Sequence, residues 1–557
     1  MPTLTHEEIQ AGAIQRLAQI RLAARNPRRW PGGDPNAQAE ALNYEWDLEG
    51  FTRRFFPHLC TAPFNPLHQA IFAQHHARQQ TLPTGQVVPA RGYREATAAP
   101  RGSAKTTIKG FIRPLHALLY QHERYILIGA ADFDLARDKV KALRDELNDN
   151  AELCRVYGLQ QTDTWTMNDF VTRTGCRVRA FSPRTHVRGL LWRGFRPTLI
   201  LLDDAEDPEA VLTELRRARL LGWLQKDIAK LGTADTNIDV IGTVLHPESL
   251  LAHLLTNPGF RRHFYRAVLQ FADGPDAWTL WAQWRELVLD LSDEERLAHA
   301  HAFFLAHEAA MLQGSEVLWP ENPTQSYEAL MLDRVIYGEA AFFQERQNEP
   351  LADTRYLFDM DAAAYCTPHP DSVTRADGRT VYYLDVPDVG AFYDPSLGRR
   401  RDCAACAVVL RDRWGYEYVV DAYCTNTDSP EVQYEAITDL LWRWQVPVIG
   451  VEVNGFQSLI PDTLRQKIAA RAQAEGVSWS VDMLPVTHTR NKILRIKTLE
   501  PYVVNGWLQF SRRLPAAYLR QFAEFLPIEN ASRDDGPDCT EGAVRVVRGI
   551  FDRRSPK

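Results

Sequence analysis

The sequence predicts an α/β protein with two or more domains, and three observations support this prediction. With 557 residues, the chain is too long for a single hydrophobic core. Short apolar runs alternate with helical patterns, which is typical of parallel strands covered by helices on both faces. Residues 99–107, with the sequence APRGSAKTT, contain the lysine and hydroxyl of a phosphate-binding loop, a motif that leads into a helix.

The composition is that of an ordinary globular protein, with 45% hydrophobic and 24% charged residues. The formal net charge of -7 gives no global basic field, although a local basic groove would be enough to bind nucleic acid. No apolar run approaches the roughly 20 residues needed to cross a bilayer, and the first residues lack the pattern of a secretory signal. The eight scattered cysteines suit a reducing cytosol, and we expect no membrane partner.

Changes of pattern along the chain divide it into segments. Residues 1–50 combine helical periodicity with a polar stretch, which predicts an N-terminal helical arm. The first α/β domain is expected over residues 51–350, and its helix-rich part, residues 248–348, is expected to form a lid subdomain. A polar linker at residues 351–380 then leads to a second α/β unit over residues 381–557.

Three apolar runs predict buried strands in the first domain, at residues 125–129, 198–202 and 238–242. A helical pattern at residues 133–148 separates the first two runs. We therefore expect a mostly parallel sheet with flanking helices.

The loop at residues 99–107 departs from the standard pattern G-x-x-x-x-G-K-[ST]. Lys105 and Thr106 are in place, but alanine occupies both glycine positions, at Ala99 and Ala104. In such loops the backbone N–H groups face phosphate oxygens, the lysine reaches the terminal phosphates, and the hydroxyl holds Mg²⁺. A helix start with a purely structural role is the alternative. The residues predicted to bind nucleotide are Arg101, Gly102, Ser103, Ala104, Lys105, Thr106 and Thr107.

Carboxylates follow the strand at residues 198–202. In nucleotide hydrolases an acid at this strand end holds Mg²⁺, so we predict that Asp203 binds the ion together with Thr106. Asp204 or Glu206 is then predicted to polarise the attacking water. An acidic turn that caps the next helix is the alternative interpretation.

The strand at residues 238–242 is followed by Thr243, a small polar residue that could sense the terminal phosphate. Together with the loop and the acidic strand, this segment resembles the ATPase half of viral terminase large subunits, the motors that pump DNA into a procapsid. The loop is similar to a variant loop of that family, which tolerates alanine before the lysine. Residues 343–350 resemble the segment that closes the motor domain. The resemblance implies that Arg101 or Arg188 acts as an arginine finger, with an ordinary surface arginine as the alternative for Arg188.

The same resemblance implies an RNase H-like nuclease domain at residues 381–557, with carboxylates that bind two divalent ions, Mg²⁺ or Mn²⁺. Asp394 stands near the end of the first strand of this unit. Glu452 is the single acid in an apolar run, where a carboxylate is unfavourable unless it is paired or metal-bound. An acidic cluster near the chain end supplies the third ligand, either Asp535 or Asp538.

Basic residues near these acids are expected to contact the DNA backbone. Lys492 and Arg495 belong to a segment that resembles the family, and residues 399–401 are three consecutive arginines. A solvated surface is the alternative for each of them.

For the whole chain, the resemblance implies a motor that uses ATP and Mg²⁺ to translocate double-stranded DNA, and an endonuclease that cuts concatemeric DNA when packaging begins and ends. The implied partners are double-stranded DNA, the portal protein and a small terminase subunit. The resemblance also implies a ring-shaped homo-oligomer on the procapsid, with a pentamer expected and a monomer in solution left open. The implied location is the host cytoplasm. The alternatives are a helicase-like or repair ATPase fused to a nuclease, and a non-enzymatic relic.

Overall fold

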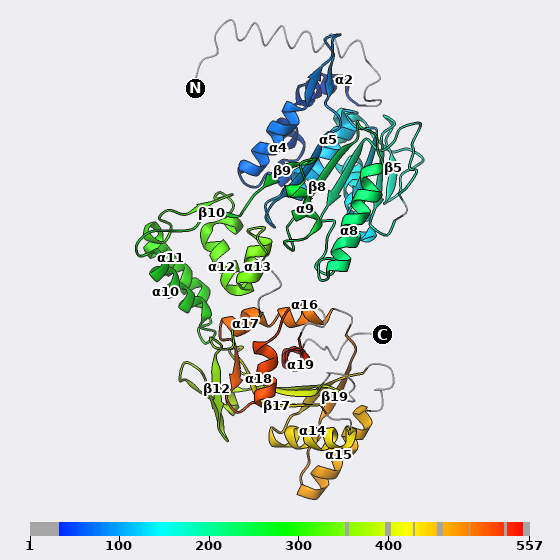
Figure 1. The fold of residues 1–557 in the computed structure, drawn as a ribbon. Helices are drawn as coiled ribbons and strands as arrows, with labels where there is room; N and C mark the ends of the chain where they lie inside the picture. The colour runs from blue at the N-terminus through cyan, green and yellow to red at the C-terminus, as the bar shows by residue number, and fades with distance from the viewer. Residues whose placement is uncertain are drawn as a thin grey trace. The chain divides into compact units, whose positions relative to one another are not determined.

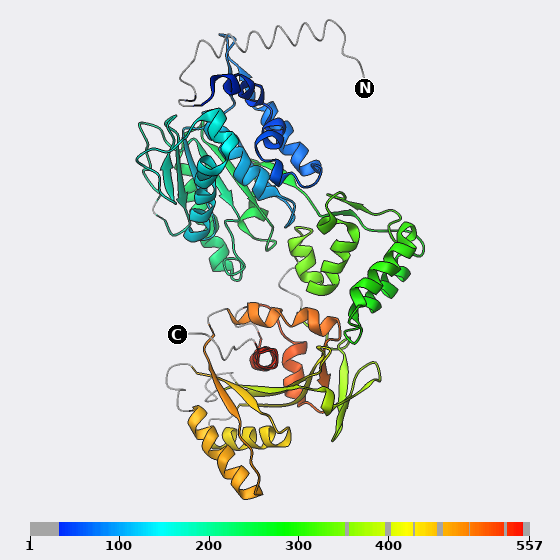
Figure 2. The ribbon, with the colours of Figure 1, turned by 180° about the vertical axis from the view of Figure 1, so that it is seen from behind.

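The computed structural model describes residue 30 and residues 33–185, 187–350, 356–395, 403–426, 429–453, 460–488, 491–528 and 532–549. These residues form two compact units (Figures 1 and 2). The described residues of the first unit lie within Met1–Phe271, Ser315–Met331 and Ala340–Pro350, and those of the second lie within Ala272–Gly314, Leu332–Glu339 and Leu351–Lys557. Residues 248–348, expected as a lid of the first domain, thus contribute to both units.

A seven-stranded sheet forms the centre of the first unit, in the order β5-β6-β4-β7-β8-β3-β9. All neighbouring strands are parallel except β5 and β6. The three strands expected from the apolar runs are confirmed as β4, β7 and β8. The strands are β3 (Arg94–Ala98), β4 (Tyr125–Gly129), β5 (Asp169–Val171), β6 (Arg177–Phe181), β7 (Leu199–Asp203), β8 (Asn237–Gly242) and β9 (Arg261–Phe264).

Helices cover both faces of this sheet, because successive strand residues point to opposite faces and both sets are apolar. Ile126 and Ile128 of β4 pack with α4, α5 and α6, whereas Tyr125 and Leu127 pack with α8 and α9. The helices are α2 (Pro35–Ala41), α3 (Leu48–Phe55), α4 (Pro66–Ala77), the π-helical segment η3 (Thr106–Ile112), α5 (Arg113–Leu119), α6 (Phe133–Asp149), α7 (Ala151–Tyr157), α8 (Glu214–Lys226) and α9 (Leu250–Thr256). Figure 1 shows α5 and α8 against this sheet.

The expected N-terminal arm falls largely outside the described residues. Trp30, where the description begins, is buried in the core of the first unit, and its indole N–H donates to the carbonyl oxygen of Leu119 at 2.7 Å. The described end of this segment is therefore part of the first unit. Two small strands, β1 (Gln79–Thr81) and β2 (Val87–Pro89), pair as a hairpin.

The second unit contains a nine-stranded mixed sheet in the order β14-β13-β12-β20-β17-β16-β15-β18-β19. Strands β15, β16 and β17 are antiparallel, and β18 and β19 continue from β15 in parallel. The strands are β12 (Tyr365–Pro368), β13 (Ser372–Thr374), β14 (Thr380–Tyr382), β15 (Asp388–Asp394), β16 (Ala404–Arg411), β17 (Glu417–Thr425), β18 (Val448–Glu452), β19 (Asp482–Val486) and β20 (Leu508–Ser511).

The expected linker needs a correction here. Residues 365–374 carry β12 and β13, and β12 pairs with β20 in the sheet. The sequence hid these strands, because β12 and β13 have only 4 and 3 residues and carry no continuous apolar run.

Helices also cover both faces of the second sheet. Tyr393 belongs to the core on the side of α14 and α15, and Phe392 belongs to the core on the side of α18 and α19. Figure 1 shows these two pairs of helices on opposite sides of the sheet. A Cβ atom added to Gly542 of α19 would lie 2.4 Å from the Phe392 ring, so glycine allows this helix to approach β15 closely. The helices are α14 (Pro430–Arg443), α15 (Ile460–Glu475), α16 (Lys492–Lys497), α17 (Glu500–Val504), α18 (Ala516–Ala523) and α19 (Asp535–Val547).

The helix-rich region that follows β9 in the sequence contains α10 (Ala277–Leu289), α11 (Arg296–Met311), α12 (Tyr327–Tyr337) and α13 (Glu339–Glu345), with the strand pair β10 (Val268–Gln270) and β11 (Glu316–Val317). In the part of the chain that the structure describes, no helix is long and apolar enough to cross a membrane.

Candidate functional site

The loop between β3 and η3 is held from several sides. The N–H of Arg101 donates to the carbonyl oxygen of Glu345 at 2.9 Å. The carbonyl oxygen of Ser103 accepts from Nε2 of His68 at 2.8 Å, and Nδ1 of His68 accepts from the N–H of Asn65 at 3.2 Å. Burial lowers the pKa of His68, so a neutral ring makes both contacts. The loop is thus fixed by α4 and by the end of α13.

Two loop residues have left-handed backbones. Gly102 has φ 80° and Ala104 has φ 57°. For an L-residue with a Cβ atom this conformation costs about 1–2 kcal/mol, which explains why the usual motif has glycine before the lysine. Ala104 adopts the same conformation and carries this strain at the start of η3.

Beyond Ala104, the lysine and hydroxyl of the loop meet the ends of β7 and β8. Nζ of Lys105 lies 3.2 Å from Oγ1 of Thr243, and Oγ1 of Thr106 donates to Oδ1 of Asp203 at 3.1 Å. β8 lies between β3 and β7, and it brings Thr243 beside the loop. Thr107 follows in η3 and is half-buried. The sequence-predicted loop, acid and threonine therefore come together in one place.

Asp203 is 1% exposed and has a partner that the sequence did not suggest. Lys139 of α6 makes an ion pair with its Oδ2. Burial raises the pKa of Asp203, although Lys139 opposes this rise. Burial likewise lowers the pKa of Lys105, against the pull of the Asp204 and Asp203 carboxylates. A carboxylate and a hydroxyl in contact are oxygen donors of the kind that Mg²⁺ prefers, so these residues fit a bound Mg²⁺ ion.

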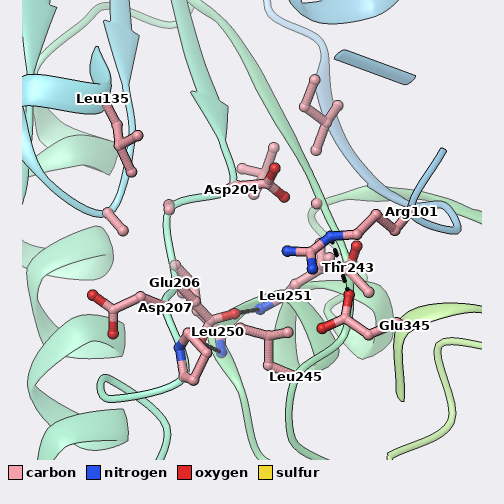
Figure 3. A pocket seen from close by; sticks show the side chains of 16 residues that line it. Arg101, Leu135, Asp204, Glu206, Asp207, Thr243, Leu245, Leu250, Leu251 and Glu345 are labelled. Atoms are coloured by element: carbon pink, nitrogen blue, oxygen red, sulfur yellow. Dashed lines mark hydrogen bonds and ion pairs between the residues drawn. The ribbon is translucent and has the colours of Figure 1, made fainter. Parts of the chain in front are cut away.

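A cavity of about 250 Å³ opens beside this cluster, and Arg101, Asp204, Thr243 and Glu345 are among its lining residues. Figure 3 shows these side chains around the cavity, with Arg101 joined to Glu345. Nε of Arg101 lies 3.4 Å from Oε2 of Glu345. Asp204 has a left-handed backbone, with φ 52°; its N–H donates to the carbonyl oxygen of Ile241 at 3.0 Å.

The two candidate catalytic acids differ in their surroundings. Both carboxylate oxygens of Glu206 accept backbone N–H groups at the start of α9, from Leu250 at 2.6 Å and Leu251 at 3.0 Å. Burial raises the pKa of Glu206. Glu206 thus caps α9 and not α8, the next helix along the chain, whose N-cap is Thr213. Both Asp204 and Glu206 line the cavity, but the carboxylate oxygens of Glu206 are already engaged by these two backbone N–H groups.

The two candidate finger arginines also differ. Arg101 lines the cavity, whereas Arg188 makes an ion pair with Asp227 at 2.6 Å and its side chain is 77% exposed. Arg188 is not among the residues that line the cavity of its own chain.

A second centre lies in the other unit. β15 ends at Asp394 and β18 ends at Glu452, and these neighbouring strands are parallel. Asp538 comes from the first turn of α19, which packs on β15. One carboxylate oxygen from each of the three residues lies within 4.8 Å of the other two. Two strand ends and a helix start thus bring three acids together.

The electrostatics of this centre favour added positive charge. Burial and the neighbouring Glu452 raise the pKa of Asp394 well above its ordinary value. Burial also raises the pKa of Asp538 to about 6, with Lys492 and Arg495 opposing the rise. Three converging carboxylates fit hard divalent ions, because such ions take oxygen ligands and replace the missing counter-charge.

The sequence did not decide whether Asp535 or Asp538 joins the other two acids, and the structure distinguishes them. Oδ2 of Asp535 accepts the backbone N–H of Cys403 at 3.1 Å, which ties the start of α19 to the start of β16. Asp538, and not Asp535, is grouped with Asp394 and Glu452.

Lys492 and Arg495, which were expected to contact DNA, make ion pairs with Asp538 and with acids near this centre. Lys492 lies 2.8 Å from Asp534 and 3.4 Å from Asp538, and buried Arg495 lies 2.7 Å from Asp538 and 2.8 Å from Glu541. Burial alone would lower the pKa of Lys492, but the surrounding carboxylates raise it. The three arginines at residues 399–401 lie outside the described residues.

Sequence patterns did not assign a role to two residues of the first centre. Lys139 and Glu345 reach it from α6 and α13, and no motif connects these positions. For Glu345 a signal did exist, since it lies within the segment 343–350 that resembled the end of a motor domain.

Comparisons with known proteins give weak similarities only. No family model and no curated protein matches the sequence. The chain is similar to the large terminase of bacteriophage HK97, with 13% identity over 90% of this chain and 99% of that chain and a TM-score of 0.32. It is also similar to the terminase nuclease domain of human cytomegalovirus, a manganese-soaked and inhibitor-bound structure, with 14% identity over 30% of this chain and 86% of that chain and a TM-score of 0.24.

A third similarity is to the large terminase nuclease of the thermophilic phage G20c, with 10% identity over 34% of this chain and 97% of that chain and a TM-score of 0.23. Identities and TM-scores this low carry no argument about fold or activity. The functional assignment therefore depends on the geometry of the two centres.

Proposed function

We propose that the chain is the large subunit of a viral terminase, a DNA-packaging motor with a fused endonuclease. One observation carries the proposal: each unit contains its own carboxylate centre at the ends of neighbouring parallel strands. In the first unit a loop lysine and hydroxyl face Thr243 and Asp203. In the second, Asp394, Glu452 and Asp538 converge.

The first centre suits nucleotide hydrolysis. When bound, Mg·ATP supplies the phosphoanhydride bond whose hydrolysis drives movement. The loop N–H groups and Lys105 would hold the phosphates, and Thr106 with Asp203 would hold the Mg²⁺ ion. Asp204, at the cavity, orients the attacking water, and Arg101 stabilises charge on the transferring phosphoryl group. Arg188, exposed on the surface, is suited to act on the site of a neighbouring copy.

The second centre suits hydrolysis of a phosphodiester. Two divalent ions, when bound, activate water and stabilise the leaving oxygen. Asp394, Glu452 and Asp538 would hold these ions, while Lys492 and Arg495 balance the charge of the acids. The strand order β17-β16-β15-β18-β19, with three antiparallel strands and then two parallel ones, supports an RNase H-like domain.

In this proposal the motor drives double-stranded DNA through the portal of a procapsid, and the nuclease cuts concatemeric DNA when packaging begins and ends. The chain acts in the host cytoplasm as a homo-oligomeric ring, a pentamer, with the portal protein and a small terminase subunit as partners. Ring copies in head-to-tail contact would bring a surface arginine of one copy to the site of the next.

The two centres can be tested separately with the purified chain. Lys105→Ala should lose ATPase activity and keep metal-dependent DNA cleavage. Asp394→Ala should keep ATPase activity and lose cleavage. If Asp394→Ala cut DNA at the wild-type rate, the nuclease assignment would be wrong. If Lys105→Ala hydrolysed ATP normally, the loop would be structural.

A helicase-like or repair ATPase fused to a nuclease has the same two centres, and no described feature favours it. Strand separation distinguishes it. A packaging motor moves along intact duplex DNA, whereas a helicase releases a displaced strand in the presence of ATP.

A further inference from the structure

Three histidines form a buried cluster in the first unit, apart from both carboxylate centres. His75 lies in the last turn of α4, His116 lies in α5, and His122 follows α5. Their exposed fractions are 5%, 0% and 7%. One ring nitrogen from each histidine lies within 4.8 Å of the other two.

Two of the ring nitrogens lack a partner. Nε2 of His75 and Nδ1 of His116 are buried and make no hydrogen bond in the described structure. A buried nitrogen without a partner is unfavourable in a folded protein and calls for an explanation. A metal ion that accepts both lone pairs would provide one.

The contacts of the other nitrogens match those of metal-binding histidines. Nε2–H of His116 donates to the carbonyl oxygen of Tyr44 at 2.9 Å, so the proton is on Nε2 and Nδ1 keeps its lone pair. Nε2 of His122 lies 3.4 Å from Oε1 of Glu45. A carbonyl or carboxylate on the second ring nitrogen orients a metal-bound imidazole and makes it a better ligand.

The charge around the cluster permits a cation. Burial lowers the pKa of His75 and lowers that of His116 to about 3, so both rings are neutral, as metal ligands must be. Two nearby arginines are already paired: Arg113 with Asp239, and Arg78 with Glu95 at 2.7 Å.

We propose that His75, His116 and His122 bind one divalent transition-metal ion of the zinc class, with water in the fourth position and Glu45 beside His122. Imidazole suits such ions better than it suits Mg²⁺. Zn–N bonds of about 2.0–2.1 Å place tetrahedral nitrogens about 3.4 Å apart, so small side-chain rotations would close the site.

The position of the ion gives it a role in the motor unit. His68, in the first turn of α4, holds the loop carbonyl of Ser103, and α5 continues the helical segment that begins with Thr106. An ion bound by His75 and His116 would join the two helices on either side of the phosphate-binding loop. The inference of a metal ion at these histidines does not depend on the proposed packaging function.

The test is zinc binding by the full-length chain, stripped with a chelator and then dialysed against Zn²⁺ with excess Mg²⁺ to occupy the carboxylates. Elemental analysis should find one equivalent of zinc in the wild type and in His263→Ala, a control at a half-buried histidine outside the cluster. His75→Ala and His122→Ala should retain less than a tenth of an equivalent. Zinc should raise the thermal midpoint of the wild type and of the control only.

A cobalt-loaded sample adds a readout that does not need the variants to fold, because four-coordinate Co²⁺ has strong visible absorption. A wild type that retains no zinc and shows no such absorption would overturn the proposal, as would equal binding by folded His122→Ala. In that case the three rings form an aromatic cluster only, with His122 stacked on Trp46.

Discussion

The left-handed backbone of Ala104 predicts that glycine at this position stabilises the motor unit. Ala104 has φ 57°, and relief of its Cβ strain contributes about 1–2 kcal/mol. Glycine also makes the unfolded chain more flexible, which costs about 0.4–1 kcal/mol. The net expectation for Ala104→Gly is therefore a gain of about 1 kcal/mol.

Ala99 provides the matched control, because it occupies the other position where the standard motif has glycine. Ala99 is fully buried and does not have a positive φ. Ala99→Gly relieves no strain, removes a buried methyl group and adds flexibility to the unfolded chain. These terms predict a loss of about 1–1.5 kcal/mol.

The assay is thermal unfolding of each variant, followed at the transition that shifts when an ATP analogue and Mg²⁺ are added. For a unit of this size, 1 kcal/mol corresponds to about 2 °C. The midpoint should rise for Ala104→Gly and fall for Ala99→Gly. If both variants lost stability equally, the strain at Ala104 would not exist.

Three other predictions concern the charged groups. Asp203→Asn should weaken Mg²⁺-dependent ATP binding at least tenfold in a calorimetric titration, while metal-independent nucleotide binding changes little; equal losses with and without Mg²⁺ would contradict its role as a ligand. Burial holds the pKa of Asp538 at about 6, above its ordinary value of 3.8, so the folded state binds a proton that the unfolded state releases. The stability of the metal-free protein should therefore fall as pH rises from about 4 to about 6, and denaturant titrations should find a flatter profile for Asp538→Asn. Arg495→Met should destabilise the second unit by about 3–5 kcal/mol, because it removes the buried cation that lies nearest to the carboxylates of Asp538 and Glu541; a loss under 1 kcal/mol would show that these ion pairs are not a main support of α19.

Features with a strong local cause were predictable from the sequence. β4, β7 and β8 are continuous apolar runs because helices cover both sheet faces, and this pattern needs no tertiary information. The ends of β15 and β18 were predictable for the same reason, since each buried strand finishes at an acid, Asp394 or Glu452.

Features that depend on contacts between distant segments could not be predicted. Helix α19 begins at Asp535, and this start places Asp538 in its first turn, where its carboxylate meets those of Asp394 and Glu452. The ion pair between Lys139 and Asp203 joins α6 to β7. Nothing in the local sequence of either residue indicates it.

The central claim is that ATP hydrolysis at Lys105 moves duplex DNA into a capsid. The most direct measurement is the amount of double-stranded DNA protected from added nuclease by portal-bearing procapsids in the presence of ATP and the chain. The wild type should protect long duplex DNA, and Lys105→Ala should protect none. ATP-dependent release of single strands without protected duplex would contradict the claim and favour a helicase.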